Sequence, residues 1–121
     1  MAVGQLYMFT IDAEDVPASA IFWSQVLGYE IQHSEDDYAM VGNGATSIGF
    51  GRIDDYSRPS WPAPSVPKQF HLDVAVDDMA AAEARCLELG ATRPDHQPGD
   101  GKWTVLLDPS GHPFCIFPKP E

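Results

Sequence analysis

This chain is short of cysteine and of long hydrophobic runs, and each shortage excludes something. Its two cysteines, Cys86 and Cys115, make only a weak case for a disulfide, which favours a reduced, cytoplasmic setting. No segment approaches the roughly 20 apolar residues that cross a bilayer. The N-terminus also lacks the basic run and apolar core of a signal peptide. We therefore expect a cytoplasmic protein with no membrane partner.

Basic residues are scarce as well. Seven Lys and Arg stand against 18 Asp and Glu, which gives a net charge of −11. Such a surface repels phosphate backbones, so a nucleic-acid partner is not expected, whereas a cationic ligand would be attracted. The alternative is an acidic, soluble surface without any meaning for a ligand.

Several familiar catalytic motifs are missing. The sequence has no Gly-rich phosphate loop, no Gly-x-Ser-x-Gly and no Cys-x-x-Cys. Phosphate-loop, serine-hydrolase and dithiol chemistry therefore find no support here, and the chemistry has to be sought in the arrangement of the chain.

That arrangement is a repeat. The same spacing separates Met8 from Asp15 and His71 from Asp78, and each segment is an apolar strand pattern that runs into an acidic residue. A helical stretch and a Leu-Gly pair follow both times. A period of about 62 residues indicates two copies of one supersecondary unit, each too small to bury a good core alone. We expect a single domain, residues 1–121, with module one at 5–52 and module two at 70–118.

Each module is predicted to be a βαβββ unit. Asp15 and Asp78 are expected to cap the helices at their N-termini, and Gly28 and Gly90 are expected to end them. The strands are expected at 5–12, 29–34, 38–41 and 46–52 in module one, and at 70–76, 92–96, 102–107 and 113–117 in module two. The turn Asp108-Pro-Ser-Gly111 joins the last two strands of module two. The fold class is therefore α+β.

A proline-rich connector, residues 53–69, joins the modules. Pro59, Pro62, Pro64 and Pro67 prevent regular ladder pairing there. The connector also carries Tyr56 and Trp61, which makes it a candidate rim for a site.

These features resemble the vicinal oxygen chelate superfamily, and within it the glyoxalase-like and bleomycin-resistance-like proteins. The resemblance rests on the repeat, on Phe70-His71-Leu72-Asp73, and on Asp108-Pro-Ser-Gly-His-Pro-Phe114. It implies the glyoxalase/bleomycin resistance/dioxygenase fold, in which two paired βαβββ modules form a curled-sheet cup, and a homodimer. Members include metal-dependent lyases, isomerases and dioxygenases as well as metal-free proteins that sequester antibiotics, so the fold does not fix the chemistry.

The metal positions of the superfamily are poorly matched. The resemblance places one ligand at His71, but its counterpart in module one is Met8, a soft and weak ligand. The glutamate expected in the last strand is replaced by Cys115, and residues 47–49 offer no carboxylate or imidazole. We therefore expect no metal, although a rebuilt divalent-metal site of His71, Asp73 and Cys115 stays open.

The candidate binding residues are polar anchors and aromatic walls. His71 and Asp73 share one face of a strand, so the carboxylate could orient the imidazole, and His71 is the one candidate for catalysis. Core or dimer packing is the alternative for the aromatic residues. The expected ligand-binding set is Met8, Asp12, Phe50, Trp61, His71, Asp73, Trp103 and Cys115.

Two functions follow. The first is a small-molecule binding protein without a catalytic metal, which sequesters a cationic or aromatic compound, because the anchor strands carry carboxylates and an imidazole but no Lys or Arg. The second is a lyase, isomerase or dioxygenase of the same superfamily, which uses either a rebuilt metal site or His71 as an acid–base group.

Overall fold

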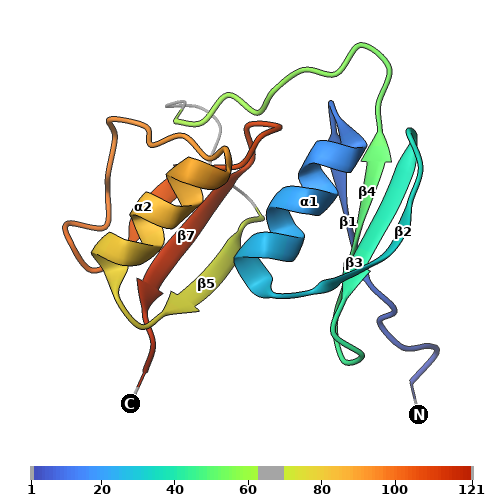
Figure 1. The fold of residues 1–121 in the computed structure, drawn as a ribbon, viewed down its shortest axis with the longest axis horizontal. Helices are drawn as coiled ribbons and strands as arrows, with labels where there is room; N and C mark the ends of the chain where they lie inside the picture. Colours follow the sequence, from blue (N-terminus) through green and yellow to red (C-terminus); the bar gives the residue numbers. More distant parts are fainter. Residues whose placement is uncertain (1, 63–69, 121) are drawn as a thin grey trace. The chain divides into compact units, whose positions relative to one another are not determined.

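The structure is a computed structural model that describes residues 2–62 and 70–120. The chain divides into two compact units, residues 1–56 (the first unit) and 57–121 (the second unit), and each has one helix on a mixed sheet (Figure 1). This confirms the α+β class. The connector residues 63–69, with Pro64 and Pro67, lie outside the described residues.

In the first unit, the sheet has the strand order β1-β4-β3-β2. Strand β1 runs parallel to β4, and the other neighbours are antiparallel. The elements are β1 (Phe9–Ala13), α1 (Val16–Leu27), β2 (Glu30–Ser34), β3 (Tyr38–Gly42) and β4 (Ser47–Arg52). Together they form the βαβββ order that the spacing predicts.

Helix α1 begins and ends as predicted. The carboxylate of Asp15 accepts a hydrogen bond from the backbone N–H of Ala18, and Gly28 ends the helix with φ 71°, a left-handed conformation that glycine adopts at little cost. The helix buries Trp23 and Phe22, whose rings pack edge to face with their centroids 5.1 Å apart. These aromatic side chains give the first unit a substantial core.

The second unit has a smaller sheet. Its strand order is β5-β7-β6, with β5 parallel and β6 antiparallel to β7. The elements are β5 (Leu72–Val76), α2 (Met79–Leu89), β6 (Thr104–Leu107) and β7 (Pro113–Pro118). Asp78 and Gly90 cap α2 as predicted, and Cys86 is the one buried residue of the helix.

The strand predicted at 92–96 does not form. Thr92 makes one isolated bridge with Leu107, and the chain then leaves the sheet. Pro94 has no N–H to donate, and the side-chain amide of Gln97 takes the place of a neighbouring strand. It donates to the backbone oxygen of Val105 and accepts from its N–H, both at 2.9 Å. The second unit is therefore βαββ rather than βαβββ.

The turn after β6 follows its sequence signature. The Asp108 carboxylate is buried and accepts hydrogen bonds from the backbone N–H groups of Ser110 and His112. Gly111 has φ 89°, which favours glycine. This turn sets the register of β6 against β7, and through it the position of Cys115.

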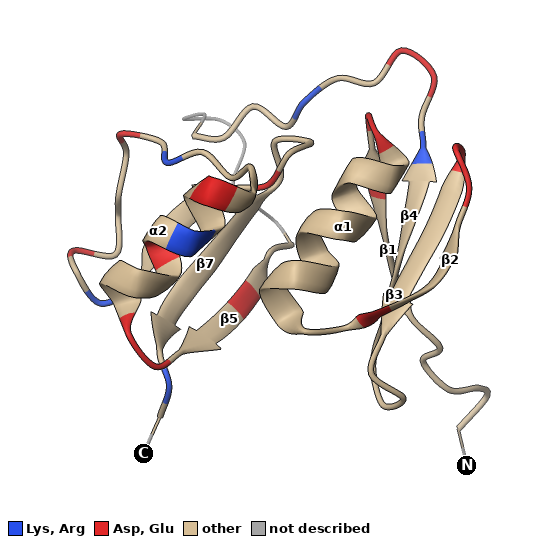
Figure 2. Cartoon of the chain, viewed as in Figure 1, with Lys and Arg blue, Asp and Glu red and all other residues tan. Residues whose placement is uncertain are grey.

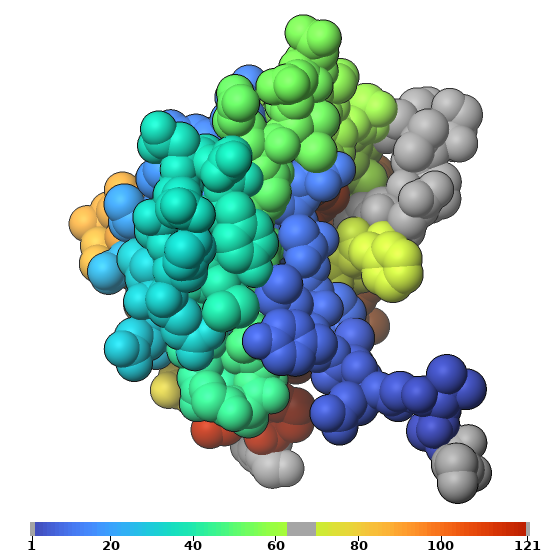
Figure 3. Space-filling view, turned by 90° about the vertical axis from the view of Figure 1, so that its right-hand side faces the viewer, coloured from blue at the N-terminus to red at the C-terminus, as the bar shows by residue number. Residues whose placement is uncertain are grey.

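The first strand is shorter than predicted. It starts at Phe9 rather than at residue 5, and Leu6 and Tyr7 are exposed. Strand β1 lies at the edge of the sheet, and its pairing with β4 begins at Phe9, opposite Ile48. Figure 3 shows this N-terminal segment, in dark blue, reaching out from the first unit.

The strand that opens the second unit is also shorter than predicted. Strand β5 begins at Leu72 rather than at residue 70, and Phe70 is exposed. Acidic positions are spread over both units and basic ones are few (Figure 2). None of the described helices has both the length and the apolar character needed to cross a membrane.

Candidate ligand-binding pocket in the second unit

The register of β5 and β7 brings three reactive side chains together. Asp73 and Cys115 are paired across the two parallel strands, so their side chains lie on the same face of the sheet. His71 precedes Asp73 by two residues and shares that face. The sequence predicted these three residues together as a possible rebuilt site, and the register of β5 and β7 brings Cys115 beside Asp73.

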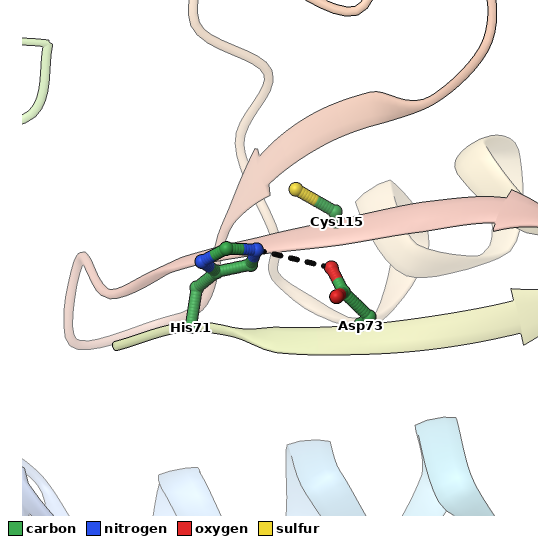
Figure 4. Close-up of side chains that lie close together, drawn as sticks. All are labelled: His71, Asp73 and Cys115. Atoms are coloured by element: carbon green, nitrogen blue, oxygen red, sulfur yellow. Dashed lines mark ion pairs between the residues drawn. The ribbon is translucent and has the colours of Figure 1, made fainter. Parts of the chain in front are cut away.

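These side chains form a compact group, shown in Figure 4. The Nε2 atom of His71 lies 3.1 Å from Oδ1 of Asp73. The side chain of His71 is 29% exposed and that of Asp73 is 59% exposed, so water screens this ion pair. Cys115 is only 3% exposed. One possible ligand atom from each of the three residues lies within 4.8 Å of the other two.

A cavity of about 400 Å³ opens over this face. Its size falls in the range of small-molecule sites, which are mostly apolar with a few polar groups. Trp103 and Phe117 supply aromatic walls, and Trp103 is 37% exposed, so its ring is accessible. The lining residues are His71, Asp73, Lys102, Trp103, Cys115 and Phe117.

Local packing holds the turn that carries Lys102 and Trp103. The backbone N–H of Lys102 donates to the oxygen of Gly99, and Gly99 is buried beneath Trp103. A Cβ atom on Gly99 would lie 2.3 Å from the backbone oxygen of Trp103 and 2.7 Å from its ring. Only glycine fits at this position, so the sequence requires Gly99 in order to place Trp103.

The other predicted site residues are not part of this pocket. Met8, Asp12 and Phe50 belong to the first unit, where Phe50 is fully buried in the core. Trp61 lies in the second unit, where its ring centroid is 5.5 Å from that of His96, and Trp61 does not line the pocket. The structure therefore groups four of the eight expected ligand-binding residues in one pocket: His71, Asp73, Trp103 and Cys115.

Two lining residues were missed by the sequence reasoning. Phe117 follows Cys115 by two residues, so the strand alternation could have placed it on the same face. Lys102 stands beside Trp103, but it lies outside the strands that carry the anchors, so alternation along those strands does not indicate it. Its presence means that the pocket does contain a cation.

In the first unit, the positions equivalent to the pocket residues of the second unit carry different side chains. There the register pairs Thr10 with Gly49, as Asp73 pairs with Cys115. A Cβ atom on Gly49 would lie 3.1 Å from Thr10 Oγ1 and 3.3 Å from the methyl carbon of Met8. The hydroxyl of Tyr38 also donates to the sulfur of Met8 at 3.7 Å. Side chains of the first unit therefore fill the space that is open in the second.

The donor atoms decide which metal this site suits. One nitrogen, one oxygen and one sulfur donor from His71, Asp73 and Cys115 do not suit Ca²⁺ or Mg²⁺, which take mainly oxygen ligands. The number of donors and their softness match a zinc-type ion, which takes three protein ligands when one position stays open. Within the first unit, the equivalent position offers only the thioether of Met8.

Cys86 is chemically different from Cys115. Burial raises the pKa of the Cys86 thiol, and the nearby charge of Glu83 raises it further, so the thiol stays protonated at neutral pH. Cys86 lies on α2 and not in the pocket. Of the two cysteines, Cys115 is the one placed to touch a ligand.

Comparison with known protein families agrees with this architecture. A family model described as a glyoxalase-like domain matches residues 8–117. Among curated proteins, "Putative glyoxylase CFP32" of Mycobacterium tuberculosis is 31% identical over an alignment of 113 residues that covers 88% of this chain and 42% of that protein. The protein of the same name from Mycobacterium bovis matches equally well. The chain thus spans less than half the length of these relatives.

Solved structures share the fold. A glyoxalase/bleomycin resistance protein/dioxygenase family enzyme from Burkholderia phytofirmans superposes with a TM-score of 0.69 at 22% identity, covering 93% of this chain and 97% of that one. The bleomycin-binding protein of Streptomyces verticillus, in complex with copper(II)-bleomycin, gives a TM-score of 0.58 at 20% identity over 99% of this chain and 100% of that one. At these identities, the likeness concerns the fold alone.

Proposed function

Because the chain belongs to the glyoxalase-like family of the vicinal oxygen chelate superfamily, we propose that it binds a small organic molecule in the pocket of its second unit, without a catalytic metal. The observation that carries this proposal is the 400 Å³ cavity, in which aromatic walls meet a His–Asp pair. Its volume lies toward the lower end of the range for small-molecule pockets, which suits a compact ligand.

The chemistry of the donors argues against a hard catalytic ion such as Mg²⁺, and a zinc-type ion belongs to the alternative function. The ions used by the superfamily's enzymes take His and Glu or Gln ligands from both modules. Here the position of one glutamate is Cys115, and the first unit has Met8 packed against Gly49. Such a set lacks the oxygen ligands that hard ions require.

The alternative is an enzyme of the same superfamily, and one observation favours it. His71, Asp73 and Cys115 gather in one place, whereas binding alone would not require a His–Asp pair beside a thiol. In this reading His71 is a general acid or base that Asp73 orients, or the three residues hold a zinc-type ion as a lyase or dioxygenase site.

Other properties are also proposed. Cys86 and Cys115 form no disulfide in the described part of the chain, which suits the reducing cytoplasm. The charge of −11 disfavours nucleic acid as a partner.

A homodimer is supported by exposed apolar residues at and before the edge strand β1, namely Leu6, Tyr7 and Phe9. Sedimentation equilibrium measures that state directly.

The binding proposal is tested with a neutral aromatic probe, 2-naphthamide, by isothermal titration calorimetry. We expect saturable binding that weakens at least tenfold in Trp103→Ala, because the ring forms a wall of the pocket. Trp61→Ala is the matched control and should bind as the wild type does. Equal losses in the two variants, or no binding to the wild type, would contradict the proposal.

A further inference from the structure

We propose that the pocket is built for an aromatic ligand that carries an anionic group, such as an aromatic carboxylate. Lys102 would be the counter-ion and Trp103 the stacking surface. This inference rests on the proposed binding function and adds the charge of the ligand. The sequence led us to expect a cationic ligand, whereas the lining of the pocket favours an anionic one.

The charges that line the cavity support an anion. Among the described lining residues, Asp73 is the one carboxylate, and it is already engaged with His71 at 3.1 Å. Lys102 also lines the cavity, and within the described residues no carboxylate lies within 4 Å of its ammonium group. The lining therefore has no net negative charge, although the chain as a whole carries −11. The pocket is thus a place on an acidic protein where an anion is tolerated.

The turn that carries Lys102 is held before any ligand arrives. Its backbone N–H is bonded to the oxygen of Gly99, and the amide of Gln97 ties the preceding loop to Val105 of β6. Gly99 lets Trp103 pack directly on the turn. The cation and the ring are therefore adjacent and fixed at the backbone, so little ordering is needed on binding.

An aromatic acid uses both features at once. Its ring stacks on Trp103, whose face is accessible, while its carboxylate accepts hydrogen bonds from the Lys102 ammonium group. A cationic ligand would meet Lys102 as a like charge and would have to compete with His71 for Asp73. The arrangement therefore favours the acid over an amine with the same ring.

The test compares three probes with one ring system and different charge: 2-naphthoate, 2-naphthamide and 2-naphthylmethylamine. Calorimetry at low and high salt gives each dissociation constant. We expect the order naphthoate, amide, amine, with naphthoate bound roughly threefold to tenfold more tightly than the amide, and this gap should shrink at high salt. Lys102→Gln should lower the affinity for naphthoate to about that for the amide and so remove the gap.

Lys119→Gln is the matched control, because Lys119 is an exposed lysine of the same unit outside the cavity. Lys119→Gln should leave the difference in affinity between naphthoate and the amide unchanged. Lys102→Glu should instead make naphthoate bind more weakly than the amide. If all three probes bind with the amine preferred, or if Lys102→Gln changes nothing, the charge inference is wrong and the binding function stands. If none of the probes binds, the proposed function fails, and the inference fails with it.

Discussion

The two units share one plan and use it differently. Trp23 and Cys86 occupy the same place in their helices, eight residues after the capping aspartates, but the first is a large buried ring and the second a small thiol. On the sheets, Met8 and Thr10 stand where the second unit has His71 and Asp73. The first unit therefore uses these positions for packing, whereas the second unit has a pocket lined with reactive groups.

The difference teaches where function can develop in a duplicated fold. A unit with an aromatic core and a full four-stranded sheet tolerates little change without loss of stability. The second unit has three strands, a helix with one buried residue, and a loop in place of its missing strand. That loop is the element that brings Lys102 and Trp103 to the pocket.

The largest expected effect concerns the cores. Trp23→Ala should lower the free energy of unfolding by about 3–5 kcal/mol, because it removes the largest fully buried side chain. Cys86→Ala, at the equivalent position, should cost only about 1 kcal/mol. Urea denaturation measures both values. Equal losses in the free energy of unfolding would mean that the two cores contribute equally to stability, which would contradict the difference between the units.

The next effect concerns the turn before β6. Gly99→Ala should destabilise the protein by about 1–3 kcal/mol, because the added Cβ atom collides with Trp103. Gly51→Ala is the control, since a Cβ atom there has nothing within 4 Å and the backbone is not left-handed. Thermal unfolding and the indole signal of Trp103 report the change. An unshifted indole signal in Gly99→Ala would show that glycine is not needed there.

A smaller effect is expected at the ion pair. Asp73→Asn should change the free energy of unfolding by less than about 1 kcal/mol, because both partners are partly exposed. Its role is in the pocket, so binding of 2-naphthamide should change more than stability does. Calorimetry and urea denaturation of the same variant separate the two effects. A loss of several kcal/mol in stability would instead make the pair a structural element.

The smallest effect is expected from metal. Addition of Zn²⁺, Ni²⁺ or Mn²⁺ should raise the melting temperature little. A true site would stabilise the native state by about 2.7 kcal/mol at a hundredfold excess over the dissociation constant. A large, saturable rise that is abolished by His71→Ala, but retained when His96 is replaced, would establish the zinc-type alternative.

Much of the fold was predictable because its signals are local. Capping aspartates, terminal glycines and strand alternation act over a few residues, and they gave both helices and most strands. The strand at 92–96 failed because the side chain of Gln97, which directly follows the segment, takes up the backbone hydrogen bonds of Val105 in β6. No periodicity within residues 92–96 records that competition.

The site was predictable in part for the same reason. His71 and Asp73 lie on one strand, so alternation alone places them together. Lys102 enters through a turn whose path depends on Gly99 and Gln97, and sequence spacing does not encode that path. The charge of the pocket therefore became clear only from the three-dimensional arrangement.

The most direct test of the central claim, that the second unit holds the ligand site, is a ¹⁵N-resolved NMR titration with 2-naphthoate. We predict that the largest shift changes fall on the backbone of His71 and Cys115 and on the indole N–H of Trp103, while Met8, Thr10 and Gly49 stay unchanged. Saturable shifts centred on Met8 and Gly49, with Trp103 unaffected, would contradict the account.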